Sequence, residues 1–341
     1  AALCLCLTGC GKQTTEATAQ IFAMDTVMEV TAYGEHAEQA VKYTEKRIEE
    51  LENRLSRTKA DSLVSGLNRD GSIRHLTYDY WNLIARAKEY RDATNGAFDI
   101  TIAPVMDAWG FTGDSFRVPE QSELDTLLKK VNSDAIQMLG SPSDSVTLGE
   151  GQAIDLGGIA KGYTSDLVEQ TFRANGIESG KISLGGNVFV LGGKPDGSDW
   201  RVGIKDPRNE SGLAAILSLR DAYAITSGGY ERYFEENGKT YHHIIDPSTG
   251  YPADSGLLSV TVVAADNGPD WAGAGNGAMC DAFSTALFVM GEEQALDFWR
   301  NGGYDFDLVL VTEDGRVVIT AGLADRFEEV KDSGYTYETV S

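Results

Sequence analysis

Asp281 and Thr285 stand four residues apart in the segment CDAFSTALFVMG (280–291), with Ser284 between them. On a helix this spacing places the Asp and the Thr on one face, with the Ser hydroxyl in reach of the same side. A carboxylate, hydroxyls and backbone carbonyls are hard oxygen ligands that suit Mg²⁺, which keeps waters and substrate phosphates as its other ligands. The segment therefore indicates a cation site. The alternative is that Asp281 only caps the helix.

Glycine pairs mark two places where a phosphate or a flat ligand can approach the backbone. Gly157 and Gly158 lie between a short strand and a helix, so N–H groups at the helix start are free to face an anion, and Lys161 adds a positive charge. The spacing matches neither the P-loop nor the dinucleotide fingerprint, and a plain strand-to-helix turn is the alternative. Gly185 and Gly186, between two strands, allow close approach of a ligand or form a simple bulge.

Two of the four histidines of the chain lie in YHHIIDPSTGYPADSG (241–256). Strand alternation predicts that His242 and His243 point to opposite faces, so that one of them points at whatever lies over the sheet. A histidine beside a carboxylate such as Asp246 forms an acid–base pair. A histidine that only packs in the sheet is the structural alternative.

The elements that position these segments are strands in runs and helices in pairs. Helical periodicity predicts helices over 35–55, 77–94, 122–131, 159–174, 280–290 and 292–301, the third with Ser122 and Asp125 in a spacing like that of a capping box. Strand patterns cover 21–34, 181–186, 188–193, 200–206, 214–219, 223–227, 241–246, 257–265, 306–312 and 316–321. This order of elements predicts an α+β fold rather than a doubly wound sheet.

The charge of the chain limits its partners. With 29 Lys and Arg against 52 Asp and Glu, the net charge of the 341 residues is −23, which disfavours binding to nucleic acid. A polyanionic substrate therefore needs a metal ion or a locally positive pocket.

The first ten residues, AALCLCLTGC, resemble the end of a bacterial lipoprotein signal peptide, with Cys10 as the lipidated residue. A buried strand or an expression artefact is the alternative. We expect residues 1–9 to be a truncated signal peptide, residues 10–20 to be the lipidated Cys10 and a flexible polar tether, and residues 21–341 to be a single domain. With no other segment of about 20 apolar residues, attachment to the membrane would be by lipid alone, on its extracytoplasmic side.

From about Met24 to Gly291 the chain resembles the ApbE family of FAD:protein FMN transferases. The matching pieces are MDT (24–26), SRTKADSLVSGLN (56–68), NGAFDITIAP (95–104), WGF (109–111), DLGGIAKGY (155–163), SLGGN (183–187), ITSGGYERYF (225–234), HHIIDPSTGYP (242–252) and DAFSTALFVMG (281–291). The resemblance implies an ApbE-like fold of mixed, largely antiparallel sheets with flanking helices, and a cleft between subregions that holds FAD.

The resemblance also implies roles for single residues. The metal site carries over to Asp281 and Thr285, with oxygens near Ala160 and Ser284, and holds Mg²⁺ or alternatively Mn²⁺. His243 and Lys161 match catalytic positions. The implied flavin or phosphate contacts are Met24, Thr26, Asp99, Gly157, Gly158, Lys161, Gly185, Gly186, Asn187, Ser227, Gly228 and His243.

One position departs from the family pattern. Asp25 stands where the family usually has Gly between the Met and the Thr of its first motif. A carboxylate there would either repel the pyrophosphate or offer the metal a further ligand.

The implied activity is Mg²⁺-dependent transfer of FMN from FAD to a Thr or Ser hydroxyl of an acceptor protein, with release of AMP and formation of a phosphoester. The implied acceptor is a redox flavoprotein subunit at the membrane. Two alternatives remain. The chain could be a Mg²⁺-dependent FAD pyrophosphatase that yields FMN and AMP, or a lipoprotein that binds FAD without chemistry.

Overall fold

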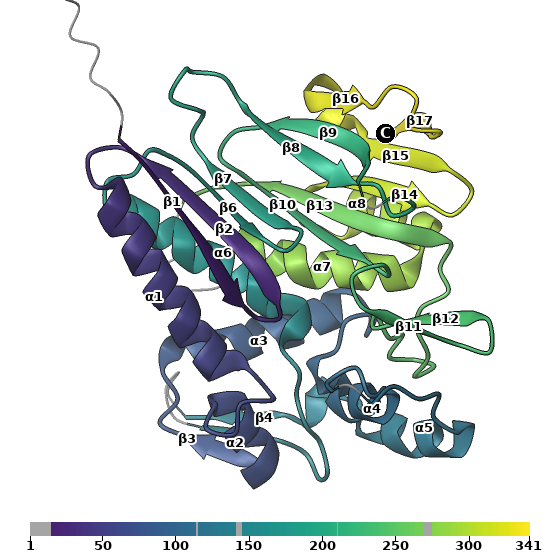
Figure 1. The fold of residues 1–341 in the computed structure, drawn as a ribbon. Helices are drawn as coiled ribbons and strands as arrows, with labels where there is room; N and C mark the ends of the chain where they lie inside the picture. Colours follow the sequence, from purple (N-terminus) through teal and green to yellow (C-terminus); the bar gives the residue numbers. More distant parts are fainter. Residues whose placement is uncertain (1–14, 114, 141–144, 210, 269–274) are drawn as a thin grey trace, which may run out of the picture.

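The computed structural model describes residues 15–113, 115–140, 145–209, 211–268 and 275–341. A nine-stranded sheet in the order β1-β2-β6-β7-β10-β13-β14-β15-β17 crosses the molecule (Figure 1). Its strands are β1 (Glu16–Ala23), β2 (Thr26–Tyr33), β6 (Ser179–Leu184), β7 (Asn187–Leu191), β10 (Ala222–Gly228), β13 (Leu257–Ala265), β14 (Asp307–Thr312), β15 (Arg316–Thr320) and β17 (Thr336–Val340). Neighbouring strands pair antiparallel, except that β15 and β17 run parallel. The predicted α+β class is confirmed.

The central strands carry apolar side chains on both faces, which explains why both faces of this sheet are covered by other elements. On β14, Leu308 and Leu310 join the apolar cluster on the helical side, whereas Val309 and Val311 join a separate cluster on the other side. Strands buried on both faces read as continuous apolar runs, as LVLV does here. The helices on the first side are α1 (Ala37–Leu55), α6 (Gly157–Ala174), α7 (Asn276–Met290) and α8 (Glu292–Asn301), and the second side carries a three-stranded sheet of β8 (Trp200–Lys205), β9 (Leu213–Leu219) and β16 (Phe327–Glu329) (Figure 1).

The chain between α1 and α6 folds mostly outside the large sheet. It forms α2 (Leu63–Asp70), α3 (Tyr78–Ala93), α4 (Ala103–Trp109), α5 (Gln121–Leu127) and a small sheet of β3 (Ser72–Arg74), β4 (Gln137–Leu139) and β5 (Ser145–Thr147). Short 3₁₀ helices cover Ile100–Ile102, Leu128–Lys130, Ser133–Ala135 and, near the C-terminus, Ala321–Arg326.

An aromatic cluster joins this region to the hairpin of β11 (Tyr233–Glu236) and β12 (Lys239–His242), which lies beside α4 and α5 in Figure 1. The Trp109 ring lies 5.3 Å from the rings of Tyr241 and Tyr251, measured between centroids. Its indole N–H donates a 2.7 Å hydrogen bond to the carbonyl of Gly250, which satisfies the polar atom of a fully buried side chain.

Most predicted elements are confirmed. The helices predicted over 35–55, 77–94, 159–174, 280–290 and 292–301 correspond to α1, α3, α6, α7 and α8. The strands predicted from residue 181 onward match β6 to β10 and β13 to β15, with β13 at the predicted bounds. The sequence patterns missed α2 and α4. Both helices are shorter than the window of about 11 residues over which helical periodicity can be recognised.

Three predictions at the ends of elements are wrong. Residues 21–34 are not one strand but the end of β1 and the whole of β2, which are joined by a turn at Met24 and Asp25. Residues 16–20, which were predicted to belong to a flexible tether, instead form part of β1 and pair with β2. Cys10 and the residues before it lie outside the described residues. The capping box at Ser122 is also absent, since α5 begins at Gln121 and its N-cap is Glu120.

The strand predicted over 241–246 is also too long. β12 ends at His242, and beyond it only an isolated bridge joins Ile245 to Pro252. Within the described ranges, none of the helices combines the length and the apolar character that crossing a bilayer requires.

Helices α6 and α7 meet at Gly162, where an added Cβ would lie 2.1 Å from the carbonyl oxygen of Gly277. We therefore expect Gly162→Ala to lower the free energy of unfolding by about 1–3 kcal/mol, since the two helix backbones must separate. The matched control is Gly66→Ala within α2, where an added Cβ meets only the end of the Arg69 side chain at 3.8 Å. That variant should gain about 0.5–1 kcal/mol. Urea denaturation measures both, and equal effects of the two substitutions would contradict the close contact.

Candidate active site

The contact between α6 and α7 brings two of the predicted segments together. An added Cβ on either Gly162 or Gly277 would lie within 2.4 Å of the other residue's carbonyl oxygen, so the two backbones touch. The backbone N–H of Gly162 donates a 2.8 Å hydrogen bond to Oδ2 of Asp281. An added Cβ on Gly158 would lie 3.4 Å from Oγ1 of Thr285. The glycine turn at 157–162 and residues 281–285 therefore form one site.

Oxygen atoms gather where these helices meet β10. Oγ of Ser227, at the end of β10, lies 2.8 Å from Oγ of Ser284 and 3.2 Å from Oγ1 of Thr285. The Asp281 side chain is 3% exposed. The carbonyl of Ala160, on the facing turn of α6, accepts a hydrogen bond from the hydroxyl of Thr164, in addition to the backbone bond that the helix itself makes. The predicted metal ligands are thus hard oxygen donors on two touching helices.

This donor set is not a complete metal cage. In the part of the chain that the structure describes, no group of three or more His, Cys, Asp or Glu side chains could hold a metal ion. A single carboxylate with hydroxyl and carbonyl oxygens suits a hard cation such as Mg²⁺, whose other ligands are waters and phosphate oxygens. The neighbouring Cys280 adds no soft ligand. Its thiol is fully buried, and burial raises its pKa well above the usual value.

Two tight turns, one at Met24 and Asp25 and one at Gly185 and Gly186, bring Thr26 against Gly185. Gly185 and Gly186 connect β6 to β7 with φ of +57° and +96°. An added Cβ on Gly185 would lie 2.2 Å from Oγ1 of Thr26, so this residue must be glycine for the turns to touch. Next in the chain, Asn187 is fully buried, and neither Oδ1 nor Nδ2 has a partner among the described residues. Because buried amides normally have partners, the side chain of Asn187 fits the predicted contact with a ligand.

The structure gives Asp25 a role that neither sequence expectation anticipated. Met24 and Asp25 have φ of +50° and +59° in a two-residue hairpin loop, a geometry that favours Gly, Asn and Asp. Oδ2 of Asp25 lies 2.9 Å from Nη2 of Arg232. In this structure the carboxylate of Asp25 therefore forms an ion pair, which the sequence did not predict.

Arg232 is the residue that sequence reasoning missed. Its guanidinium also donates to the carbonyl of Phe111 at 2.6 Å. Its own carbonyl lies 3.1 Å from Nδ1 of His243 and accepts a 3.0 Å bond from the backbone N–H of His243. The only available signal was its place inside the family string ITSGGYERYF. Arg232 thus connects the first turn, the aromatic cluster and the predicted catalytic histidine.

The hydrogen bond to Arg232 assigns the tautomer of His243. A carbonyl only accepts, so Nδ1 must carry the proton, and Nε2 keeps its lone pair. Burial, followed by the positive charges of Lys161 and Arg232, lowers the pKa of His243 to about 3. The ring is therefore neutral at physiological pH. Lys161 itself is half-buried near the start of α6.

The other histidine is structural. Nε2 of His242 lies 3.0 Å from the carbonyl of Ala253, and its ring meets Phe288 edge-on with centroids 5.4 Å apart. The predicted pairing of a histidine with Asp246 is not found. The rings of His242 and His243 contact backbone carbonyls, and Asp246 accepts hydrogen bonds from the N–H and hydroxyl of Ser248. The two histidines have different surroundings, but His243 lies beyond the end of β12, so strand alternation is not the cause.

Asp99 does not fit the ligand role that was expected of it. Its buried carboxylate accepts bonds from the N–H and hydroxyl of Thr101 and from the N–H and hydroxyl of Ser133. These bonds hold the loop before α4 in place, and we omit Asp99 from the candidate site. Gly157 is likewise engaged, since its N–H donates to Oδ1 of Asp155 at 2.8 Å.

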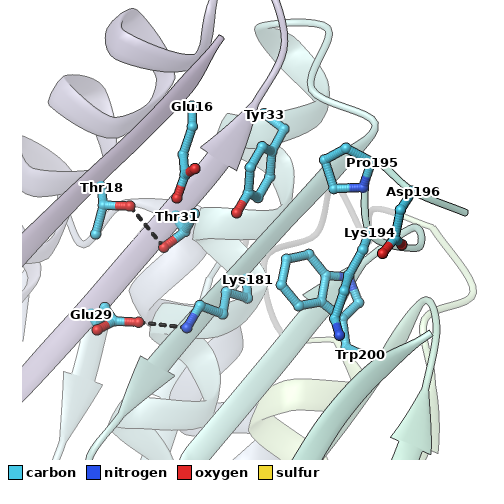
Figure 2. Close-up of a pocket in the computed structure, with 10 residues that line it drawn as sticks. All are labelled: Glu16, Thr18, Glu29, Thr31, Tyr33, Lys181, Lys194, Pro195, Asp196 and Trp200. Atoms are coloured by element: carbon cyan, nitrogen blue, oxygen red, sulfur yellow. Dashed lines mark hydrogen bonds and ion pairs between the residues drawn. The ribbon is translucent and has the colours of Figure 1, made fainter. Parts of the chain in front are cut away.

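The other predicted flavin or phosphate contacts lie at the start of α6, at neighbouring strand ends and on the segment after β12. They are Met24, Thr26, Gly158, Lys161, Gly185, Gly186, Asn187, Ser227, Gly228 and His243. A separate cavity of about 590 Å³ lies between strands β1, β2 and β6 on one side and the segment from Lys194 to Trp200 on the other (Figure 2). It is lined by Glu16, Glu29 and Asp196 as well as two lysines, and none of the predicted site residues borders it. We therefore place the site at the contact of α6 and α7.

Comparisons with known proteins bear on the family of the chain. Residues 24–308 match the model of the ApbE family. The FAD:protein FMN transferase of Klebsiella pneumoniae strain 342 is 33% identical over 294 residues, which are 84% of this chain and 86% of that protein. The one of Treponema pallidum strain Nichols is 31% identical over 307 residues, 85% of this chain and 82% of that protein. The crystal structure of the ApbE protein of Thermotoga maritima superposes with a TM-score of 0.79 at 30% identity, over 93% of this chain and 97% of that one.

The lowered pKa of His243 gives a testable result. A histidine whose folded pKa lies below its unfolded value contributes stability above the unfolded pKa of about 6.5, and this stability is lost as the pH falls toward 3. We expect ¹⁵N NMR of the ligand-free protein to show His243 neutral and protonated on Nδ1 down to pH 5, with His243→Gln used for assignment. Titration of this ring with a midpoint near 6.5 would contradict the assignment.

Proposed function

Because the chain belongs to the ApbE family, we propose that it is an FAD:protein FMN transferase that moves FMN from FAD to a hydroxyl group of an acceptor protein. The observation that carries this proposal is the contact of the glycine turn of α6 with Asp281, Ser284 and Thr285 of α7. It places phosphate-binding backbone beside hard oxygen donors, which is the pairing that a pyrophosphate substrate requires.

A divalent cation is part of the proposal, Mg²⁺ with Mn²⁺ as the alternative. The residues present fit such an ion. Asp281 would supply the carboxylate, Thr285 the hydroxyl, and Ala160 and Ser284 backbone oxygens. Ser227 lies within hydrogen-bond distance of both α7 hydroxyls and orients them. When bound, the ion would neutralise charge on the pyrophosphate and make AMP a better leaving group.

The residues of this chain position and deprotonate the reactants. Lys161 and the start of α6 hold phosphate oxygens, and the unpartnered amide of Asn187 binds the flavin nucleotide. Nε2 of His243 accepts the proton of the acceptor hydroxyl as its oxygen attacks the FMN phosphorus. The bond from that phosphorus to the AMP oxygen breaks, and AMP leaves. The product is FMN joined to the acceptor by a phosphoester.

The neutral state of His243 supports this role. A ring that carries its proton on Nδ1 presents the lone pair of Nε2 at any physiological pH. The two negative charges of a bound pyrophosphate would raise the pKa of His243 from about 3 toward the range in which a base works best.

Two alternatives use the same residues. If water takes the place of the acceptor hydroxyl, the reaction is FAD hydrolysis to FMN and AMP. If neither acceptor reacts, the protein binds FAD without chemistry. The buried Asp281 and the oriented His243 favour a reaction, because binding alone requires neither.

We expect Asp281→Ala to abolish flavin transfer while the fold stays intact, since the substitution removes the only carboxylate of the proposed cation site. The protein is incubated with FAD, Mg²⁺ and a Thr-containing acceptor protein, and the acceptor is weighed by mass spectrometry while FMN and AMP are quantified. An acceptor heavier by one FMN identifies transfer, free FMN with AMP identifies hydrolysis, and unchanged FAD identifies binding alone.

The control for Asp281→Ala is Asp206→Ala. Asp206 is also buried, but it accepts its hydrogen bonds from Tyr335 and Arg208 in another part of the molecule. This control should keep its transfer activity. Full activity of Asp281→Ala with Mg²⁺ present would rule out the proposed metal site.

The acceptor and the location of the enzyme are separate proposals. We propose that the acceptor is a membrane redox subunit with a Thr or Ser in a short motif, and that Cys10 carries a lipid that holds the enzyme on the extracytoplasmic side. Confinement of enzyme and acceptor to one surface raises their effective concentration.

The proposed anchor predicts the distribution of the protein in cells. Expressed from its complete gene, the wild type should sediment with the membrane fraction and Cys10→Ser should appear in the soluble extracytoplasmic fraction. Cys280→Ser serves as the control, because Cys280 is fully buried in α7. Membrane association of Cys10→Ser equal to that of the wild type would disprove the anchor.

A further inference from the structure

Asp166, one turn beyond Gly162 on α6, is a buried carboxylate to which the proposed mechanism gives no role. Its oxygens accept hydrogen bonds from three backbone N–H groups at the start of α7: Gly275 at 2.9 Å, Gly277 at 2.8 Å and Ala278 at 3.0 Å. The first turn of a helix leaves such N–H groups without partners inside the helix. The N-cap residue of α7, Gly275, has no side chain to satisfy them. Asp166 therefore caps α7 from a neighbouring helix.

This cap is half of a reciprocal arrangement. Asp166 of α6 accepts hydrogen bonds from the backbone of α7, and four residues further along α7 Asp281 accepts one from the backbone of α6, at Gly162. Between the two carboxylates, Gly162 and Gly277 let the helix backbones touch. Each carboxylate thus fixes the other helix on one side of the glycine contact. A shift of α7 along or around its axis breaks both sets of hydrogen bonds at once.

We propose that Asp166 is a positioning residue for the proposed cation site: its carboxylate sets the register of α7 against α6 and so places the oxygens of Asp281 and Thr285 opposite Ala160. In this proposal Asp166 acts through α7 and is not itself a ligand of the ion or the substrate. The inference rests on the proposed function, since it assigns Asp166 a part in assembling that site.

The cost of burying Asp166 supports a role beyond ordinary capping. Burial raises the pKa of Asp166 to about 7, although the three backbone donors and the hydroxyl of Tyr223 lower it. It borders a cavity of about 270 Å³ that is also lined by the acidic Glu169 and Asp266. A serine or asparagine at residue 275 would cap α7 at less cost. A local cap would satisfy the backbone of α7 alone. A carboxylate on α6 also fixes the position of α7 relative to α6.

A pair of variants separates positioning from capping. Asp166→Asn keeps one carbonyl oxygen but places an NH₂ group against a backbone N–H, so both register and cap are weakened. In Asp166→Asn with Gly275→Ser, the new hydroxyl caps α7 locally, since Gly275 already has the extended backbone of an N-cap. If Asp166 only caps, the double variant regains wild-type behaviour. If it sets the register, the double variant regains stability but not metal affinity.

The primary measurements are the Mg²⁺ concentration that gives half-maximal flavin transfer and the Mn²⁺ affinity of the protein with FAD, determined by electron paramagnetic resonance without acceptor. We expect both to weaken about ten-fold or more in Asp166→Asn and in the double variant, as is typical when a group that orients metal ligands is lost. Asp206→Asn, which alters a buried carboxylate remote from α7, should leave both unchanged. Thermal melting reports the stability of each variant.

Wild-type metal dependence of Asp166→Asn, or its recovery in the double variant, would overturn the inference while leaving the proposed cation site standing. Wild-type metal dependence of Asp281→Ala in the same assays would remove the cation site itself. The two failures are thereby distinguished.

Discussion

The contact of two glycines, Gly162 on α6 and Gly277 on α7, is the constraint on which the proposed site depends. The two backbones approach so closely that a Cβ added to Gly162 would lie 2.1 Å from the carbonyl oxygen of Gly277. Such an approach requires that neither residue has a side chain. That approach lets the N–H of Gly162 reach the carboxylate of Asp281, and it aligns Ser284 with Ser227 on β10. The sheet and the two apolar clusters hold the helices in place, but the glycine contact turns ordinary helix packing into a site lined with oxygens.

Sequence patterns predicted what depends on local periodicity. The stripe of α1 and the apolar runs of β13 and β14 repeat often enough to reveal their type, and the spacing of Asp281 and Thr285 indicates a shared helix face. Contacts between distant segments leave no such pattern. Asp99 stands in a family motif, yet its partner Ser133 lies 34 residues away, so its structural task is visible only in three dimensions. The ion pair of Asp25 with Arg232 joins residues 207 apart and was equally hidden.

The ion pair with Arg232 shows how the structure accommodates Asp25, which stands where the family usually has Gly. The hairpin turn between β1 and β2 needs positive φ at both of its residues, which Asp tolerates better than most side chains. Both partners are exposed, with side-chain exposures of 42% for Arg232 and 78% for Asp25, so the pair itself adds little stability. Its consequence is geometric. The residue that neutralises Asp25 is the one whose carbonyl fixes the tautomer of His243, so the first motif and the proposed base are coupled through Arg232.

The net charge of −23 would repel a pyrophosphate from most of the surface. His243 reports the local field at the proposed site. Burial is the largest cause that lowers its pKa, and the positive charges of Lys161 and Arg232 contribute to the same shift. The cations that help to keep the ring neutral would also attract an anionic ligand. As such a ligand binds, its charge offsets theirs, and the affinity of His243 for a proton rises. At the proposed site, substrate binding and activation of the proposed base would therefore be one electrostatic event, and neither would require the protein as a whole to be basic.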